Sequence, residues 1–217
     1  MKPIIRKENV KPLFESKFLR VFDLQYEEGK HYFDATRRPL ENIVATKSDE
    51  EFKAMLPDAV TCVVILRIKG EEPKLLLTKE YRYPTGRFLL SPPAGLLDPE
   101  DAAESNPLLT AAKREILEET GIVVGESDSL SVISPLLFSS PGMTDESNAL
   151  VCAVITLNDT SSLSQDGAVG SECFDGFMLL SAEEAKDILK AGCDPDGIFY
   201  SVYTWGALMY FISDLWR

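Results

Sequence analysis

The stretch Thr-Ala-Ala-Lys-Arg-Glu-Ile-Leu-Glu-Glu-Thr-Gly-Ile, residues 110–122, carries the strongest signal in this chain. Its pattern predicts one helix, in which Glu115, Glu118 and Glu119 lie on a single face at spacings i, i+3 and i+4. Like charges placed in this way oppose helix formation by roughly 0.2–0.5 kcal/mol per pair. A divalent cation held by oxygen ligands removes the conflict, because it supplies the missing positive charge. The helix is therefore a candidate metal site, and Gly121 is positioned to end it in the left-handed conformation.

Acidic helix faces are also common on solvated surfaces, so the residues around the helix decide between the two interpretations. Upstream lies Ser-Pro-Pro-Ala-Gly-Leu-Leu-Asp (residues 91–98), a rigid loop of the kind that brings backbone close to a ligand. The loop, the acidic helix and the closing glycine together resemble the Nudix box. Its pattern is Gly, five residues, Glu, seven residues, then Arg-Glu-aliphatic-x-Glu-Glu-x-Gly-aliphatic. The matching positions are Gly95, Arg114, Glu115, Ile116, Glu118, Glu119, Gly121 and Ile122.

The spacing between the glycine and the arginine departs from that pattern. Arg114 follows Gly95 by 114 − 95 = 19 positions, where the box has about 14, so the loop over residues 98–106 is longer. The first box Glu, which in the family usually supports the arginine, has no unique counterpart. The available residues are Glu100, Asp101 and Glu104, with Asn106 at the position counted back from the arginine. We expect metal binding to persist and the loop geometry to differ.

Segments on both sides of the box resemble the ADP-ribose pyrophosphatase branch of this superfamily. Residues 79–84, leading into residues 93–98, resemble the branch's run Gln-Tyr-Arg-x-Pro … Pro-Ala-Gly-Leu-Ile-Asp, with Glu80 in place of the usual Gln. Residues 139–146 resemble the Ser-Pro-Gly-x-x-x-Glu loop downstream of the box. Residues 170–172 place a late Glu before an apolar strand, as family members do. The resemblance therefore covers most of the chain.

The resemblance also implies roles for particular residues. It implies that Mg²⁺, with Mn²⁺ as the alternative ion, is held by the backbone carbonyl of Ala94 and by Glu115, Glu118 and Glu119. It implies a catalytic centre containing Arg114 and a general base, which is either Glu172 or Glu146. The substrate-binding residues expected from it are Arg82, Arg37, Arg38, Gly95 and Met143.

Each of these assignments competes with a plainer interpretation as a surface or turn residue. Arg82 favours a phosphate contact, because a guanidinium presents a fork of donors that matches phosphate oxygens. Arg37 and Arg38 are adjacent, and neighbouring strand residues face opposite ways, so only one of them can point inward. The Ser140-Pro141-Gly142 segment is equally compatible with an ordinary turn.

The expected activity is that of a Nudix diphosphatase, a hydrolase that acts on acid anhydrides. The favoured reaction is Mg-dependent hydrolysis of a nucleoside diphosphate linked to another moiety, with ADP-ribose going to AMP and ribose 5-phosphate. Two alternatives remain open from the sequence. One is a pyrophosphatase for a sugar nucleotide of the GDP-mannose or UDP-glucose type, and the other is a non-catalytic sensor that binds ADP-ribose. Three clashing carboxylates argue against the sensor, because a pure binder does not need them.

Composition and charge limit the possible binding partners of the protein and the cellular compartment expected for it. The net charge of −13 over 217 residues argues against nucleic acid as a partner, because binders of the phosphate backbone carry basic patches. Four scattered cysteines without a Cys-x-x-Cys pair indicate reduced thiols in a cytoplasmic protein. The polar start of the chain, broken by Pro3, predicts no secretory signal. The aromatic stretch 197–216 is interpreted as a packed helix rather than a membrane span, because it contains Asp214 and several hydroxyl residues.

Hydrophobic patterning predicts an α/β protein. Strands are expected over residues 18–26, 31–36, 41–45, 59–68, 74–81, 130–137, 149–157 and 174–180. Capping-box patterns predict helices that start at Ser48 and Ser181. The expected architecture is a Nudix α/β/α sandwich with a mixed sheet over residues 57–217, preceded by a β-rich segment over residues 1–56. In the family such a segment helps to form a homodimer and contributes to the substrate pocket.

Overall fold

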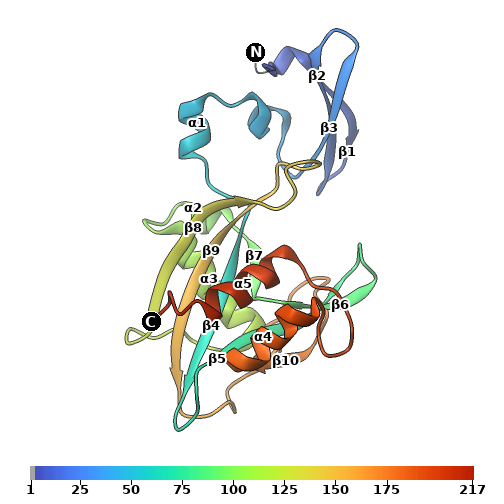
Figure 1. Ribbon diagram of the computed structural model, residues 1–217. Coiled ribbons are helices and arrows are strands. Elements are labelled where there is room, and N and C mark those ends of the chain that lie inside the picture. The colour runs from blue at the N-terminus through green and yellow to red at the C-terminus, as the bar shows by residue number, and fades with distance from the viewer. Residues whose placement is uncertain (1–2) are drawn as a thin grey trace. The chain divides into compact units, whose positions relative to one another are not determined.

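The computed structural model describes residues 3–217 and divides them into two compact units (Figure 1). The first unit comprises the N-terminal residues up to Asp58 together with Leu136–Asn148, and the second comprises Ala59–Pro135 with Ala149–Arg217. The strands are β1 (Val10–Glu15), β2 (Arg20–Glu27), β3 (Lys30–Thr36), β4 (Ala59–Ile68), β5 (Lys74–Arg82), β6 (Arg87–Ser91), β7 (Ala94–Leu96), β8 (Ser129–Phe138), β9 (Ser147–Leu157) and β10 (Phe174–Leu180). The α-helices are α1 (Asp49–Ala54), α2 (Pro99–Ala102), α3 (Pro107–Thr120), α4 (Ala182–Ala191) and α5 (Val202–Ile212).

The first unit contains an antiparallel three-stranded sheet in the order β1-β2-β3. Phe22 and Leu24 alternate along β2 and pack on the same face with Val10 of β1 and with Ile43. Two strand positions, β2 and β3, agree with the expectation from sequence within two residues at each end. The capping box at Ser48 is confirmed, since its hydroxyl accepts a hydrogen bond from the Glu51 N–H and begins α1.

The strand expected over residues 41–45 is wrong. This segment forms two 3₁₀ turns, Leu40–Asn42 and Val44–Thr46. Ile43 between them is fully buried under β2, and the Val44 N–H donates to the Asp145 carboxylate at 3.0 Å. The backbone donor therefore has a side-chain partner in place of a neighbouring strand, which the local sequence does not reveal.

The segment Leu136–Asn148 belongs to the first unit although it is distant from the N-terminus in sequence. Its turn lies along β3, where the Ala35 N–H donates to the Met143 carbonyl at 3.0 Å and the Tyr32 hydroxyl donates to the Gly142 carbonyl at 2.7 Å. A backbone and a side-chain contact from one strand thus hold the turn that carries the Ser-Pro-Gly motif.

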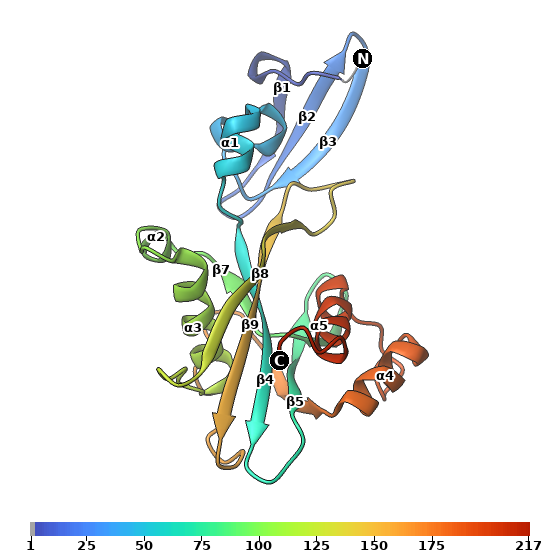
Figure 2. The same ribbon diagram turned by 60° about the vertical axis from the view of Figure 1, so that its left-hand side comes forward.

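The second unit is built on a mixed seven-stranded sheet. Its main path has the order β10-β5-β4-β9-β8, and β6 and β7 pair with β5 and β4. The pairs β4–β5, β5–β6, β4–β7 and β10–β5 are antiparallel, whereas the arrows of β4 and β9 point the same way (Figure 2). The sequence pattern predicted none of the strands β1, β6 and β7; the last two occupy a loop-like region rich in proline and glycine.

Strand β4 shows why helices cover both faces of this sheet. Nine of its ten residues are buried, and a strand with two apolar faces must be covered on both. Val63 and Ile65 face a cluster that includes α4 and α5, while Cys62 and Val64 face a cluster that includes α3. Figure 2 shows α3 on one side of the sheet and α4 and α5 on the other, which confirms the α/β/α arrangement.

The aromatic C-terminal stretch forms a shorter helix than its composition suggested. Helix α5 has 11 residues, and its Ala207, Leu208 and Phe211 are buried against the sheet. Within residues 3–217, no helix combines the length and the apolar character that crossing a membrane requires.

Candidate active site

Helix α3 is anchored in the core by its apolar side and carries the carboxylates of the candidate site next to it. Ala111, Ala112 and Ile116 pack into the core, which turns the adjacent side of the helix toward the loop before it. Glu115 and Glu119 lie one turn apart and are 4% and 2% exposed. Gly121 ends the helix with φ 74°, so the expected left-handed cap is confirmed.

The loop that precedes the helix approaches these carboxylates closely. β7 pairs with β4, placing Gly95 opposite Val60. A Cβ added to Gly95 would lie 2.0 Å from Glu115 Oε1, so any larger residue at this position requires the Glu115 carboxylate to move. The Ala94 N–H donates to Glu119 Oε1 at 3.0 Å. The loop and the helix therefore form one structure in which backbone and carboxylates are in direct contact.

Arg114 holds the acidic residues around it together. Its Nη1 donates to Glu115 at 2.6 Å and to Glu118 at 3.2 Å. Its Nη2 donates to the Leu96 carbonyl at 2.9 Å and to Asp101 at 2.8 Å. One guanidinium thus connects the loop, the inserted segment and the helix.

The inserted segment supplies the carboxylate that supports Arg114. Its residues Pro99–Ala102 form the short helix α2, and Asp101 of that helix is only 5% exposed. Glu100 and Glu104 are exposed. Asp101 is therefore the residue that occupies the supporting position among the alternatives left by the sequence, and the longer loop is accommodated by one extra helical turn.

Burial raises the pKa values of Glu115 and Glu119 above the ordinary value of a carboxyl group. Burial above all raises the pKa of Glu115 to about 7, although the Arg114 charge opposes the change. Burial likewise raises the pKa of Glu119 to about 9, and the charges of Glu80, Glu115 and Glu172 add to the effect against the hydrogen bond from Ala94. Glu119 Oε2 is buried and has no hydrogen-bond partner within residues 3–217. An ionised oxygen in this position requires a cation.

The donor set fits Mg²⁺, which prefers carboxylate and carbonyl oxygens. As the side chains lie, no group of three Asp, Glu, His or Cys residues within residues 3–217 is arranged to hold a metal ion. In this arrangement Arg114 pairs with Glu115 and Glu118, and the Ala94 N–H donates to Glu119. The arginine thus neutralises part of the negative charge that a cation would neutralise.

The end of strand β5 carries two further charged residues, one of which acts on this cluster. Arg82 Nη2 lies 2.6 Å from Glu80 Oε2. Glu80 is 9% exposed, and its charge acts on Glu119. From the sequence, Arg82 is predicted to bind substrate, whereas Glu80 is noted only as the residue that replaces the usual Gln. The signal that identifies Glu80 is its i, i+2 spacing from the arginine on a strand, which puts both on one face.

Glu172 belongs to the same cluster. It lies just before β10, and the Tyr81 N–H donates to the Cys173 carbonyl at 2.8 Å, which joins this turn to β5. Its charge raises the pKa of Glu80, Glu115 and Glu119. Glu172 itself is exposed, and one carboxylate oxygen accepts from the Val169 N–H at 2.8 Å.

The remaining predicted site residues lie in the first unit. Arg37 is half-exposed and pairs with Glu146 at 3.2 Å. The Arg38 side chain is 14% exposed, with Nη2 2.8 Å from Asp58 and Nε 3.7 Å from Asp145. The two arginines have different partners, but they follow the end of β3, so strand alternation does not set their directions. Met143, in the Ser-Pro-Gly turn, is 63% exposed.

With this geometry established, comparison with known proteins identifies the class. The profile of the NUDIX domain family matches residues 55–194, so the chain belongs to the Nudix family. Nudix hydrolase 2 of Caenorhabditis elegans is 39% identical over 94 residues, which cover 43% of this chain and 38% of that protein. ADP-ribose pyrophosphatase of Saccharomyces cerevisiae is 32% identical over 102 residues, which cover 46% of this chain and 40% of that protein. The chain thus spans about two fifths of the length of these relatives.

A solved structure supports the fold over the whole chain. The crystal structure of an ADP compounds hydrolase aligns with a TM-score of 0.57 at 21% identity, and the alignment covers 100% of this chain and 94% of that one. At this identity the likeness establishes the fold, which is the Nudix fold with an added N-terminal sheet.

Proposed function

We propose that this protein hydrolyses the diphosphate of a nucleoside diphosphate linked to another moiety, and that ADP-ribose, cleaved to AMP and ribose 5-phosphate, is its substrate. The observation that carries the proposal is the buried, unpartnered Glu119 Oε2 within a cluster of five carboxylates: Glu80, Glu115, Glu118, Glu119 and Glu172. The yeast relative named ADP-ribose pyrophosphatase supports the choice of substrate.

Glu115, Glu118, Glu119 and the Ala94 carbonyl are the proposed ligands of Mg²⁺. When bound, the metal neutralises charge on the diphosphate oxygens and lowers the pKa of a coordinated water. Arg114 orients Glu115 and Glu118 through the hydrogen bonds described above. Arg114 is itself oriented by Asp101. Two successive layers of hydrogen bonds therefore support the proposed ligands.

Glu172 is the favoured general base, which takes a proton from the attacking water. Its charge acts on Glu115 and Glu119, two of the proposed metal ligands, which supports this choice. Glu146, the other candidate, pairs with Arg37. If Glu172 is the general base, Glu172→Gln loses turnover at all Mg²⁺ concentrations and Glu146→Gln retains it. If Glu146 is the base, the two outcomes are exchanged.

Arg82, Arg37, Arg38, Gly95 and Met143 are the proposed substrate-binding residues. Arg82 is 43% exposed and offers its guanidinium to the phosphates. Between the adjacent arginines, Arg37 is the better candidate for direct contact, because Arg38 is engaged in buried ion pairs. Gly95 brings backbone to the phosphates without a side chain in the way.

A homodimer formed through the first unit is part of the proposal. The three-stranded sheet leaves large apolar side chains exposed, which is unusual for a surface that faces only water. These are Leu13, Phe14, Tyr32 and Phe33 on the strands, with Phe18 in the turn before β2. Sedimentation of the purified protein at micromolar concentration would show a dimer if this surface is covered by a second copy.

The substrate is tested by incubating the purified protein and Mg²⁺ with ADP-ribose, GDP-mannose, UDP-glucose, NADH and diadenosine polyphosphates, and identifying products by chromatography. Preferred release of AMP and ribose 5-phosphate from ADP-ribose supports the proposal. Preference for a sugar nucleotide would overturn the substrate and leave the metal site intact. Tight binding of ADP-ribose without any cleavage would indicate a sensor.

The metal site has a separate test. Glu119→Gln removes the charge of the unpartnered oxygen, and turnover at saturating Mg²⁺ should fall by at least about 100-fold. Near-wild-type turnover of this variant would contradict the metal assignment. A matched control is Glu126→Gln, which removes an equal charge from an exposed loop after the same helix.

A further inference from the structure

The ion pair between Glu80 and Arg82 joins one buried and one accessible group. Both residues lie on the same face of β5, two positions apart. The Glu80 side chain is 11% exposed, whereas that of Arg82 is 43% exposed. The carboxylate is therefore fixed within the protein, and the guanidinium lies at its edge, where it can exchange partners.

Glu80 is also part of the acidic cluster. Among the charges that raise the pKa of Glu119, that of Glu80 has the largest effect. The β5–β10 register places Glu80 opposite Phe174, two residues after Glu172. Glu119 Oε2 is itself buried and has no hydrogen-bond partner within residues 3–217. Glu80 therefore pairs directly with Arg82, and its charge also acts on Glu119 of the acidic cluster.

We propose that Glu80 is a positioning residue that controls the Arg82 guanidinium. While the acidic cluster lacks a cation, Glu80 holds Arg82. Once a divalent cation neutralises the cluster, Glu80 releases Arg82 toward a phosphate group. This inference rests on the proposed function, because it concerns the same diphosphate site. It makes anion binding by Arg82 dependent on prior cation binding.

The physical basis is competition for one guanidinium. Carboxylate and phosphate oxygens both match the donor fork of arginine, so Arg82 cannot satisfy both fully at once. A half-exposed ion pair is weak enough to exchange. When a cation reduces the negative charge around Glu80, the Glu80–Arg82 attraction falls and the phosphate becomes the better partner. Removing the Glu80 charge should therefore strengthen metal-free anion binding and weaken cation binding.

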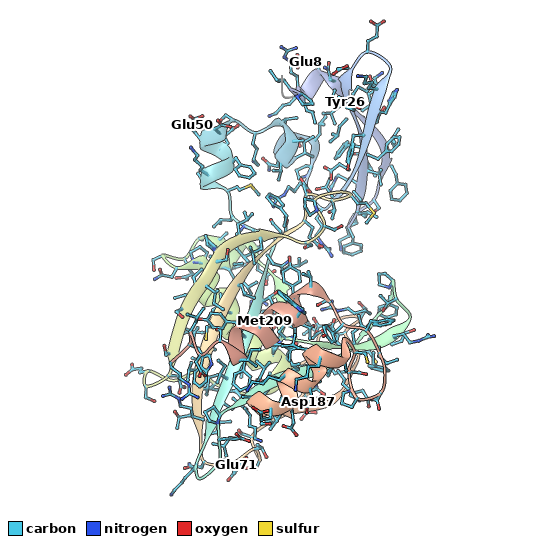
Figure 3. The ribbon with its side chains drawn as sticks, in the orientation of Figure 1. Glu8, Tyr26, Glu50, Glu71, Asp187 and Met209 are labelled. Atoms are coloured by element: carbon cyan, nitrogen blue, oxygen red, sulfur yellow. The ribbon has the colours of Figure 1, made fainter. Side chains whose placement is uncertain are left out.

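The test uses Glu80→Gln, which is isosteric and abolishes the charge. In EDTA, calorimetric titration with inorganic pyrophosphate should show at least about threefold tighter binding than wild type. Titration of the metal-free protein with Mn²⁺ should show about tenfold weaker binding. The control is Glu71→Gln, an exposed carboxylate in the turn before β5 that Figure 3 labels. Six residues of strand separate Lys74 from Glu80, roughly 20 Å, so this control should leave both affinities unchanged.

Two further variants keep the inference falsifiable. Glu80→Asp retains the charge but shortens the reach to Arg82, so Mn²⁺ affinity should be kept while pyrophosphate binding tightens. In an Arg82→Gln background, Glu80→Gln should no longer increase pyrophosphate affinity threefold, because the guanidinium that it would release is gone.

The inference predicts that Glu80→Gln tightens pyrophosphate binding and weakens Mn²⁺ binding. A purely structural role of Glu80 does not predict changes in opposite directions. If Glu80→Gln weakens both ligands together, or leaves pyrophosphate affinity unchanged or undetectable, the inference is wrong. Neither titration requires turnover. A protein that fails to cleave ADP-ribose but shows the opposite shifts would refute the proposed substrate and support the role of Glu80.

Discussion

Asp101 of α2 accepts a 2.8 Å hydrogen bond from the guanidinium of Arg114, thirteen residues later in α3. Burial alone would raise the pKa of Asp101, but the hydrogen bonds from Arg114 and the Asp98 N–H overcome this and hold the pKa below its ordinary value. The inserted helical turn therefore contributes a charged support for the arginine that orients Glu115 and Glu118, two of the proposed metal ligands.

Replacing Asp101 by Asn should disable the site without changing a proposed ligand. Loss of the charge leaves Arg114 with a weaker partner, so we expect a loss of about 1–3 kcal/mol in the free energy of unfolding and at least about tenfold in kcat. Urea unfolding and steady-state kinetics measure the two effects. Glu100→Gln and Glu104→Gln, on exposed neighbours, should behave as wild type, and an equal loss in either would show that Asp101 is not the specific support.

Gly95→Ala should be poorly tolerated because its Cβ would overlap the Glu115 carboxylate. We expect about 1–3 kcal/mol of destabilisation from overpacking and a fall in turnover, measured on the same preparation. Gly206→Ala is the matched control, since nothing lies within 4 Å of the added Cβ in helix α5. It should be neutral or stabilise the protein by up to about 1 kcal/mol through helix propensity. Full activity of Gly95→Ala would show that the loop does not touch Glu115 in solution.

The adjacent arginines should differ sharply in their effect on stability. Arg38→Ala leaves the buried carboxylates of Asp58 and Asp145 without their cation, and we expect a loss of about 3–5 kcal/mol. Arg37→Ala breaks only a half-exposed pair with Glu146, which is worth about 0–1 kcal/mol. Chemical denaturation distinguishes the two. Similar losses for both variants would mean that the Arg38 network is not buried as the structure shows.

Asp34 gives the first unit a pH-dependent stability. Burial, assisted by the charge of Asp145, raises the pKa of Asp34 from 3.8 to about 6, against the hydrogen bond from the Asp145 N–H and the charge of Arg38. The native state therefore binds more protons than the unfolded state between about pH 4 and 6. The free energy of unfolding consequently falls as pH rises through this window.

Asp34→Asn should remove this dependence. The amide oxygen can still accept from the Asp145 N–H, so we expect the variant to be about 1–3 kcal/mol more stable than wild type at pH 7 and no more stable at pH 4. Urea unfolding at both values measures the difference. Glu28→Gln removes an exposed charge from the same unit and should show no such pH effect. A wild type that gains stability relative to Asp34→Asn on going from pH 4 to 7 would reverse the sign and refute the account.

The sequence determined the elements whose signals are local. Residues 59–68 form β4 with the predicted bounds, because an unbroken apolar run requires a strand buried on both faces. The capping boxes at Ser48 and Ser181 and the glycine after α3 set helix ends through interactions within four residues. The spacing of Glu115, Glu118 and Glu119 likewise follows from helix periodicity alone.

Tertiary structure decided what depends on contacts between distant segments. The backbone of residues 41–45 turns because Asp145, about a hundred positions away, accepts its N–H. Asp101 could not be distinguished from Glu100 and Glu104 until α2 placed it beside Arg114. The charge of Glu80 acts on Glu119 of α3 only in the folded protein, where β5 pairs with β10. A sequence pattern records periodicity along the chain, whereas the burial and charge that give these carboxylates their properties arise only when remote segments exclude water together.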